Sequence, residues 1–194
     1  DQKFVARTCL VCKIVLIWVE VTVTITVTFL AKPPERDTFH QLLLDYYNTM
    51  IPMNPPHIAA ILSADRNADE FWTEIDDYMP PRGRLALAHD ASGVLLGGGM
   101  MRTMRPDAVE FKRLFVRPEG RGLGLGRMLV QARLDAAREM GMKKVFADTL
   151  RGTVAMQSLY KSFGFREIDR YPESHTAISL PALRPELRYF QLDL

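Results

Sequence analysis

The stretch Arg121-Gly122-Leu123-Gly124-Leu125-Gly126 decides the fold of this chain. It follows an apolar, strand-like run, residues 111–116, and a turn that contains Pro118, and it opens a helix-like segment, residues 125–140. Glycines at such a junction let the backbone approach a ligand closely, because they carry no Cβ. The free N–H groups of the first helical turn then point at the ligand, with the positive end of the helix dipole behind them. This arrangement binds phosphate, so the stretch predicts a ligand that carries a pyrophosphate group.

The spacing of the glycines narrows the choice of ligand. A dinucleotide fold needs G-x-G-x-x-G, and a nucleotide P-loop needs G-x-x-x-x-G-K-[ST]; residues 120–127 supply neither pattern. The pattern present, R-x-x-G-x-G, resembles the acetyl-CoA loop of the GNAT superfamily of acyl-CoA-dependent N-acetyltransferases. The alternative interpretation is an ordinary tight turn before a helix.

The flanking sequence strengthens the resemblance. Residues 110–119, Glu-Phe-Lys-Arg-Leu-Phe-Val-Arg-Pro-Glu, resemble the fourth strand of the superfamily and its exit turn. Residues 159–165, Leu-Tyr-Lys-Ser-Phe-Gly-Phe, resemble its L-Y-x-x-x-G-F signature on a second helix, residues 154–162, which follows a buried strand, residues 144–150. Two motifs in the right order are stronger evidence than either one alone. The resemblance covers most of residues 26–194.

The resemblance implies an α/β (α+β) domain with the GNAT fold. Its central sheet is mixed but mostly antiparallel, with about six or seven strands flanked by about four helices. The fourth and fifth strands splay apart to admit the pantetheine arm. We expect residues 19–194 to form this single domain, and residues 1–18 to be an N-terminal extension that has no counterpart in the family.

Composition agrees with one domain and argues against nucleic-acid binding. The chain has 194 residues, and its 25 Lys and Arg against 23 Asp and Glu give a net charge of +2. Nucleic-acid binding usually requires a clear basic excess, so we expect no nucleic-acid partner. Five basic residues cluster near the glycines, and they either form a solvated face or attract an anionic cofactor: Lys112, Arg113, Arg117, Arg121 and Arg127.

The amino-terminal part carries two weaker signals. Cys9 and Cys12 have redox- or zinc-like spacing, but one pair supplies only half of a structural zinc site, so we expect two incidental thiols and no metal. The alternation of β-branched residues predicts a first strand over residues 21–31. The uninterrupted apolar run is too short for a membrane span, so we expect no membrane partner.

The segment between this strand and the motifs covers the acceptor in the superfamily. Asp37 is expected to cap a helix that includes Phe39 and Met50, and residues 71–79 belong to a second helix whose aromatic side chains we assign to the core. Residues 84–89 and 94–104 then form a hairpin. His57 and His89 lie where an acceptor site could be, although a lone histidine is more often structural or exposed.

Acetyl transfer from a thioester to an amine makes three demands. The amine must lose a proton, the tetrahedral oxyanion must be stabilised, and the leaving thiolate must be protonated. By the resemblance, Tyr160 lies next to the cofactor sulfur and is the candidate acid, with a core tyrosine as the alternative. Glu110 is the candidate base, directly or through water, with an ion-paired carboxylate as the alternative. The backbone N–H of Leu114 or Val116 is expected to polarise the thioester carbonyl.

The resemblance implies acetyl-CoA as the cosubstrate. The candidate cofactor-binding residues are Leu114, Phe115, Val116, Arg121, Gly122, Leu123, Gly124, Leu125, Gly126, Arg127, Thr153 and Tyr160. Thr153 stands where the family often has Asn, and it can still bond a pantetheine amide or cap the helix.

We therefore expect a cytoplasmic enzyme that transfers an acetyl group from acetyl-CoA to a primary amine of a small molecule or peptide, by direct attack. Two alternatives remain open. One is a non-catalytic acetyl-CoA sensor, and the other is an acyltransferase on the same fold that uses another acyl-CoA or an O-acceptor. A homodimer is also left open.

Overall fold

A computed structural model of the protein describes residues 24–194. The predictions on residues 1–18, on Cys9 and Cys12, and on the first residues of the first strand lie outside this range. A seven-stranded sheet forms the centre of the described part, in the order β1-β2-β3-β4-β5-β7-β6. The strands are β1 (Ile25–Phe29), β2 (Gly83–Asp90), β3 (Leu95–Arg105), β4 (Ala108–Val116), β5 (Lys144–Leu150), β6 (Arg166–Ile168) and β7 (Leu187–Asp193).

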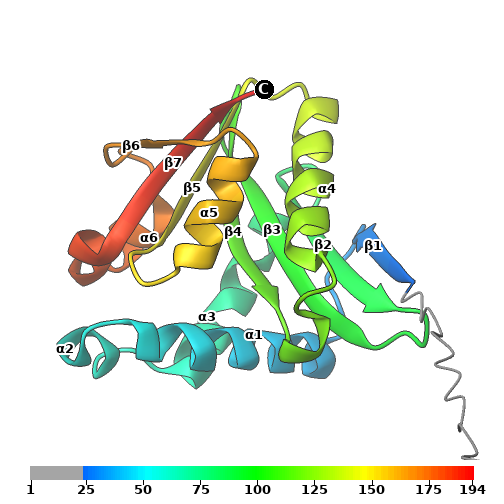
Figure 1. Ribbon diagram of the computed structural model, residues 1–194, viewed down its shortest axis with the longest axis horizontal. Coiled ribbons are helices and arrows are strands. Elements are labelled where there is room, and N and C mark those ends of the chain that lie inside the picture. Colours follow the sequence, from blue (N-terminus) through cyan, green and yellow to red (C-terminus); the bar gives the residue numbers. More distant parts are fainter. Residues whose placement is uncertain (1–23) are drawn as a thin grey trace, which may run out of the picture.

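All neighbouring strands pair antiparallel except β4 and β5, which are parallel. This mixed, mostly antiparallel sheet confirms the predicted fold class, and the hairpin of β2 and β3 and the buried strand β5 are confirmed with it. The helices lie on both sides of the sheet (Figure 1). They are α1 (Arg36–Met50), α2 (Pro56–Ala59), α3 (Ala64–Glu74), α4 (Leu125–Glu139), α5 (Val154–Ser162) and α6 (His175–Ser179).

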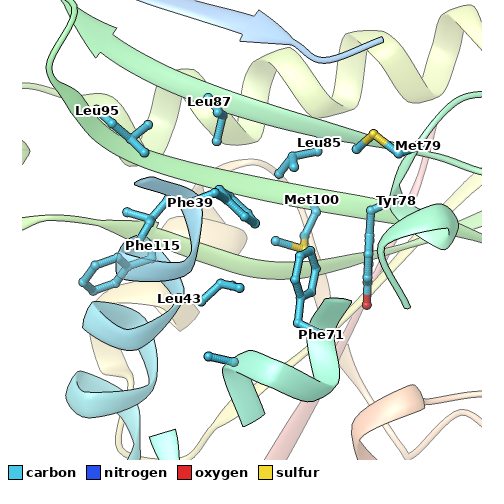
Figure 2. Packing of buried hydrophobic residues seen from close by; sticks show 12 residues of the cluster. Phe39, Leu43, Phe71, Tyr78, Met79, Leu85, Leu87, Leu95, Met100 and Phe115 are labelled. Atoms are coloured by element: carbon cyan, nitrogen blue, oxygen red, sulfur yellow. The ribbon is translucent and has the colours of Figure 1, made fainter. Parts of the chain in front are cut away.

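Alternation along β2 explains how one strand serves two layers of helices. Leu85 and Leu87 belong to the core cluster shared with α1 and α3, whereas Ala86 and Ala88 belong to the cluster shared with α4. Successive side chains of a strand point to opposite faces, so each face is covered by its own helices. Figure 2 shows the first cluster, in which Phe39 of α1 and Phe71 of α3 lie against the strands. The aromatic residues predicted for the core pack there: Phe71 and Tyr78 are fully buried, and Trp72 is partly buried against the same cluster. The predicted helix ends earlier, at Glu74, and Tyr78 lies in the 3-10 turn that follows.

The N-cap residue of α1 differs from the one predicted. Glu35, not Asp37, occupies the N-cap of α1, and its carboxylate accepts the backbone N–H groups of Asp37 at 3.0 Å and Thr38 at 2.8 Å. An N-cap side chain accepts the N–H groups two and three residues after it, so a cap at Glu35 starts the helix two residues earlier than a cap at Asp37 would.

β4 and β5 separate part-way along their length. Their pairing runs only from Ala108 opposite Lys144 to Phe111 opposite Ala147, although both strands continue. On its other side, β4 has one residue more between Lys112 and Phe115 than β3 has opposite. This β-bulge bends the strand at the point where it leaves β5. Strands four and five are therefore splayed, as predicted.

One close approach within the sheet gives a stability prediction. A Cβ at Gly83 would lie 2.2 Å from the backbone oxygen of Asp77 and 2.4 Å from that of Met101. Backbone oxygens cannot move aside as a side chain can, so we expect Gly83→Ala to lower the free energy of unfolding by about 3 kcal/mol in urea denaturation.

The matched control is Gly126→Ala. Its Cβ would meet only a side-chain carbon of Leu159, at an ordinary 3.4 Å, and alanine favours a helix over glycine by about 0.5–1 kcal/mol. Equal losses in both variants would show that the contact around Gly83 is not what requires glycine.

Among residues 24–194, no helix is long and apolar enough to cross a membrane.

Candidate functional site

A cleft of about 340 Å³ opens where β4 and β5 separate. One wall comes from α1 and α3, the opposite wall from the ends of β4 and β5 and from α5, and a third side from α6 and the segment that leads into β7. Tyr160, Thr153 and Leu114, three of the residues singled out in the sequence, line it together. The cleft thus brings the separated part of β4 and the second sequence motif together with α1 and α3, whereas residues 121–127 do not line it.

The predicted phosphate-binding stretch lies at the beginning of α4. Gly122 and Gly124 both have φ of +79°, a left-handed conformation that favours glycine, and nothing lies within 4 Å of a Cβ built on either. Gly124 is the N-cap of α4, and no side chain caps this helix. The first N–H groups of α4 are therefore free of side-chain partners, in an open space that suits an anion.

The basic residues near this stretch divide into two groups. Arg121 lies in the loop before α4, and Arg127 lies in the first turn of that helix. Arg121 Nε donates to the Val116 carbonyl at 3.3 Å. Arg117 instead pairs with Asp45 at 2.8 Å. Lys112 and Arg113 line the cleft and pair with carboxylates there. Neighbouring acids thus engage the charges of these three residues, and Lys112 is buried, so the five do not form one solvated face. Attraction of an anionic cofactor stays a prediction.

Arg113 forms the centre of the bulge in β4. Its φ is +45°, which is rare for a residue other than glycine and is held only where surrounding contacts require it. Its guanidinium donates to the hydroxyls of Tyr47 at 2.9 Å and Tyr78 at 2.5 Å, and it lies 3.3 Å from Glu74 Oε2. These contacts tie the separated part of β4 to α1 and α3.

Lys112 and Asp148 form a buried ion pair across the gap between β4 and β5. Lys112 Nζ lies 3.1 Å from Asp148 Oδ1 and also donates to Thr176 Oγ1 at 2.5 Å. Burial alone would lower the pKa of Lys112, but the charges of Asp148 and Glu110 outweigh it and raise the pKa above its usual range. The lysine is therefore a fixed cation at the floor of the cleft.

Tyr160 is buried but lines the cleft from α5. Burial raises the pKa of its phenol, and the negative charge of Asp148 adds to the rise. The positive charges of Arg133 and Lys112 lower the pKa, but burial outweighs them and the pKa remains raised. The phenol is therefore protonated at neutral pH and retains a proton to donate.

Arg133 of α4 is the charged group that acts most strongly on the Tyr160 phenol. It is fully buried, its Nη1 donates to the Met100 carbonyl at 3.1 Å, and its Nη2 has no hydrogen-bond partner among the described residues. Gly99 leaves room for it, since a Cβ there would lie 3.1 Å from the guanidinium carbon. A buried cation near the phenol favours the tyrosinate that remains after proton donation.

The structure places Glu110 beneath the cleft, not on its surface. The side chain is fully buried, and its carboxylate accepts hydrogen bonds from Tyr171 Oη at 2.8 Å, the His175 backbone N–H at 3.1 Å and Arg102 Nε at 3.2 Å. Its role as the base stays a prediction. The observed contacts match the alternative of an ion-paired carboxylate.

Thr153 precedes α5 but does not cap it with its side chain. Its hydroxyl donates to the Leu150 carbonyl at 2.6 Å and lies 2.6 Å from the Thr149 hydroxyl. The prediction that the Thr153 side chain caps the helix is therefore wrong, and its contact with a pantetheine amide stays a prediction.

The cleft contains a histidine that no sequence pattern indicated. His57 and His89 do not line it, whereas His175 does, and His175 Nε2 lies 3.0 Å from Glu74 Oε1. Burial alone would raise the pKa of Glu74, but the His175 hydrogen bond and the Arg113 charge outweigh it and lower the pKa to about 2. No motif marks residues 166–186, so only the tertiary structure brings His175 to the site.

Comparisons with known proteins agree with this geometry. The model of the Acetyltransferase (GNAT) family matches residues 39–165. An uncharacterized N-acetyltransferase from Schizosaccharomyces pombe is 31% identical over 148 residues, which are 76% of this chain and 86% of that protein.

Solved structures share the fold. A GNAT family acetyltransferase from Staphylococcus aureus superposes with a TM-score of 0.67 at 19% identity, covering 87% of this chain and 99% of that one. A GNAT family acetyltransferase from Elizabethkingia anophelis, solved with acetyl-CoA bound, superposes with a TM-score of 0.59 at 20% identity, covering 88% and 98%.

Proposed function

Because this chain belongs to the acetyltransferase (GNAT) family, we propose that it transfers an acetyl group from acetyl-CoA to a primary amine of a small molecule or peptide. One observation carries the proposal. The opening between β4 and β5 meets a protonated tyrosine, Tyr160, in the same cleft that α1 and α3 wall on the acceptor side.

The described residues fit acetyl-CoA as the cosubstrate. The uncapped start of α4, with Gly122 and Gly124 in left-handed conformations, offers backbone N–H groups and no side chain in the way of a pyrophosphate. The pantetheine arm would lie along the separated ends of β4 and β5, next to Leu114 and Thr153. The acetyl-CoA-bound relative from Elizabethkingia anophelis supports this choice of cosubstrate.

Direct attack explains why an acid and a base are both needed. The amine nitrogen forms a bond to the acetyl carbonyl carbon, and the C–S bond breaks with its electron pair going to sulfur. Tyr160 gives its proton to that sulfur, and a base takes the proton that the amine loses. The acceptor side offers Tyr46, Tyr47 and Met50 to an apolar body.

The test is release of free CoA from acetyl-CoA in the presence of a panel of primary amines, matched alcohols and no acceptor. We expect thiol release only with amines, and a product heavier by one acetyl group. Tight acetyl-CoA binding without turnover of any acceptor would support a sensor instead. Release with alcohols alone would support an O-acyltransferase.

Arg121 provides a prediction for the phosphate end. We expect Arg121→Ala to weaken CoA binding by about tenfold in calorimetry, because a charge-assisted bond to phosphate contributes about 1.5 kcal/mol. Binding of pantetheine, which lacks the pyrophosphate, should not change. Arg151→Ala is the control, since that exposed arginine instead donates to the Pro185 carbonyl. An equal loss for both ligands would give Arg121 a structural role.

A further inference from the structure

We propose that His175, held by Glu74, accepts the proton that the acceptor amine loses. This inference rests on the proposed function and names the base that the reaction needs. It assigns the task to a residue outside the two sequence motifs, and it gives Glu110 the task of positioning that residue.

The ring of His175 is oriented by its partners. Nε2 lies 3.0 Å from Glu74 Oε1 and 3.4 Å from Ser179 Oγ. The pKa of Glu74 is lowered to about 2, because its partners outweigh the effect of burial, so it is ionised at neutral pH and can only accept. Nε2 therefore carries the hydrogen of this pair. The second nitrogen, Nδ1, has no protein partner among residues 24–194 and retains a lone pair for a proton.

His175 lines the cleft, and its backbone is held close to the point where β4 and β5 separate. The backbone N–H of His175 donates to Glu110 Oε1 at 3.1 Å, and Glu110 immediately precedes the last residue of β4 that pairs with β5. The next residue, Thr176, donates to Asp148 Oδ1 at 3.1 Å, and Asp148 is the first residue of β5 beyond that pairing. The first turn of α6 thus lies over the point where the strands separate.

Charged groups from several elements surround His175. Glu74 faces the ring from α3, and the Glu110 carboxylate of β4 lies behind its backbone N–H. Each nearby carboxylate also pairs with a cation: Arg113 lies 3.3 Å from Glu74 Oε2, Arg102 Nε lies 3.2 Å from Glu110 Oε2, and Lys112 Nζ lies 3.1 Å from Asp148 Oδ1 of β5. Glu74 is the carboxylate in direct contact with the ring, and it would stabilise the positive charge that the ring acquires on taking the amine proton.

Glu110 is less suited to this task because its lone pairs are already used. Its side chain is fully buried, and it accepts hydrogen bonds from Tyr171, His175 and Arg102. It does not line the cleft. We therefore treat Glu110 as a positioning residue that holds the start of α6.

The proton transfer balances with the acetyl transfer. An ammonium N–H bond breaks, its proton goes to His175 Nδ1, and its electron pair becomes the amine lone pair that attacks the carbonyl carbon. The leaving sulfur receives the proton of Tyr160. The imidazolium then releases its proton to water, and the tyrosinate regains one.

The experiment measures the pH profile of His175→Gln with the most active amine of the panel. Glutamine still donates to Glu74 but takes up no proton. At neutral pH we expect kcat/KM to fall by about 10²-fold, the scale of a general base. The loss should shrink as the pH rises and free amine becomes abundant. Acetyl-CoA affinity should not change.

Two further variants sharpen the result. Glu74→Gln should also lower kcat/KM, because the ring loses the carboxylate that orients it. His57→Gln, a change at an exposed histidine of α2 outside the cleft, should leave the profile unchanged.

A loss in His175→Gln that is the same at every pH would mean a structural role and overturn this inference. Undiminished amine acetylation in that variant would overturn it while the proposed function stands. If the wild-type protein acetylates no amine, the proposed function fails first, and the proposed base fails with it.

Discussion

Tyr160→Phe should lower kcat by about 10²-fold or more, while acetyl-CoA still binds with unchanged affinity. The substitution removes only a hydroxyl, and the ring remains packed on Phe165 and Phe190, at centroid distances of 4.9 and 5.6 Å. Burial keeps the pKa of the phenol raised, so the wild-type group is protonated and able to donate at neutral pH. Steady-state kinetics and calorimetry of the same samples measure both quantities.

The matched control is Tyr189→Phe. That tyrosine is also buried, and its hydroxyl lacks a hydrogen-bond partner among the described residues, but it does not line the cleft. Its kcat should match the wild type. Full activity of Tyr160→Phe at all pH values would mean that the thiolate leaves unassisted and that Tyr160 is a packing residue.

Gly124→Val should abolish measurable acetyl-CoA binding in calorimetry. A branched side chain would enter the open space before α4, where the pyrophosphate is expected to approach the backbone. The left-handed φ of +79° is unfavourable for valine, so we also expect a loss of about 1–3 kcal/mol in the free energy of unfolding.

Gly141→Val separates these two effects. Gly141 follows α4 at its other end, its φ is +74°, and nothing lies within 4 Å of a Cβ built on it. This variant should lose similar stability and retain its affinity. Retained affinity in a folded Gly124→Val variant would remove the loop from the cofactor site.

The sequence by itself determined the elements whose signals are local. The strand over residues 144–150 and the helix over residues 154–162 match the structure at both ends. Apolar periodicity indicates both elements. Gly164 follows the helix with φ of +89°, a conformation that glycine adopts more easily than other residues do. The glycine stretch before α4 is a local signal of the same kind. Because these motifs depend on neighbours along the chain, they were readable without coordinates.

Only the tertiary structure decided which charges meet in the cleft. Lys112 and Arg113 looked like part of a basic cluster, but the bulge in β4 turns them toward Asp148 and Glu74, which lie far away in the sequence. His175 reaches Glu74 from a five-residue helix that no motif marks. The physical reason is the range of the interactions. Burial and ion pairing depend on partners that the fold brings together, whereas glycine conformation and helix periodicity depend on the chain's own next few residues.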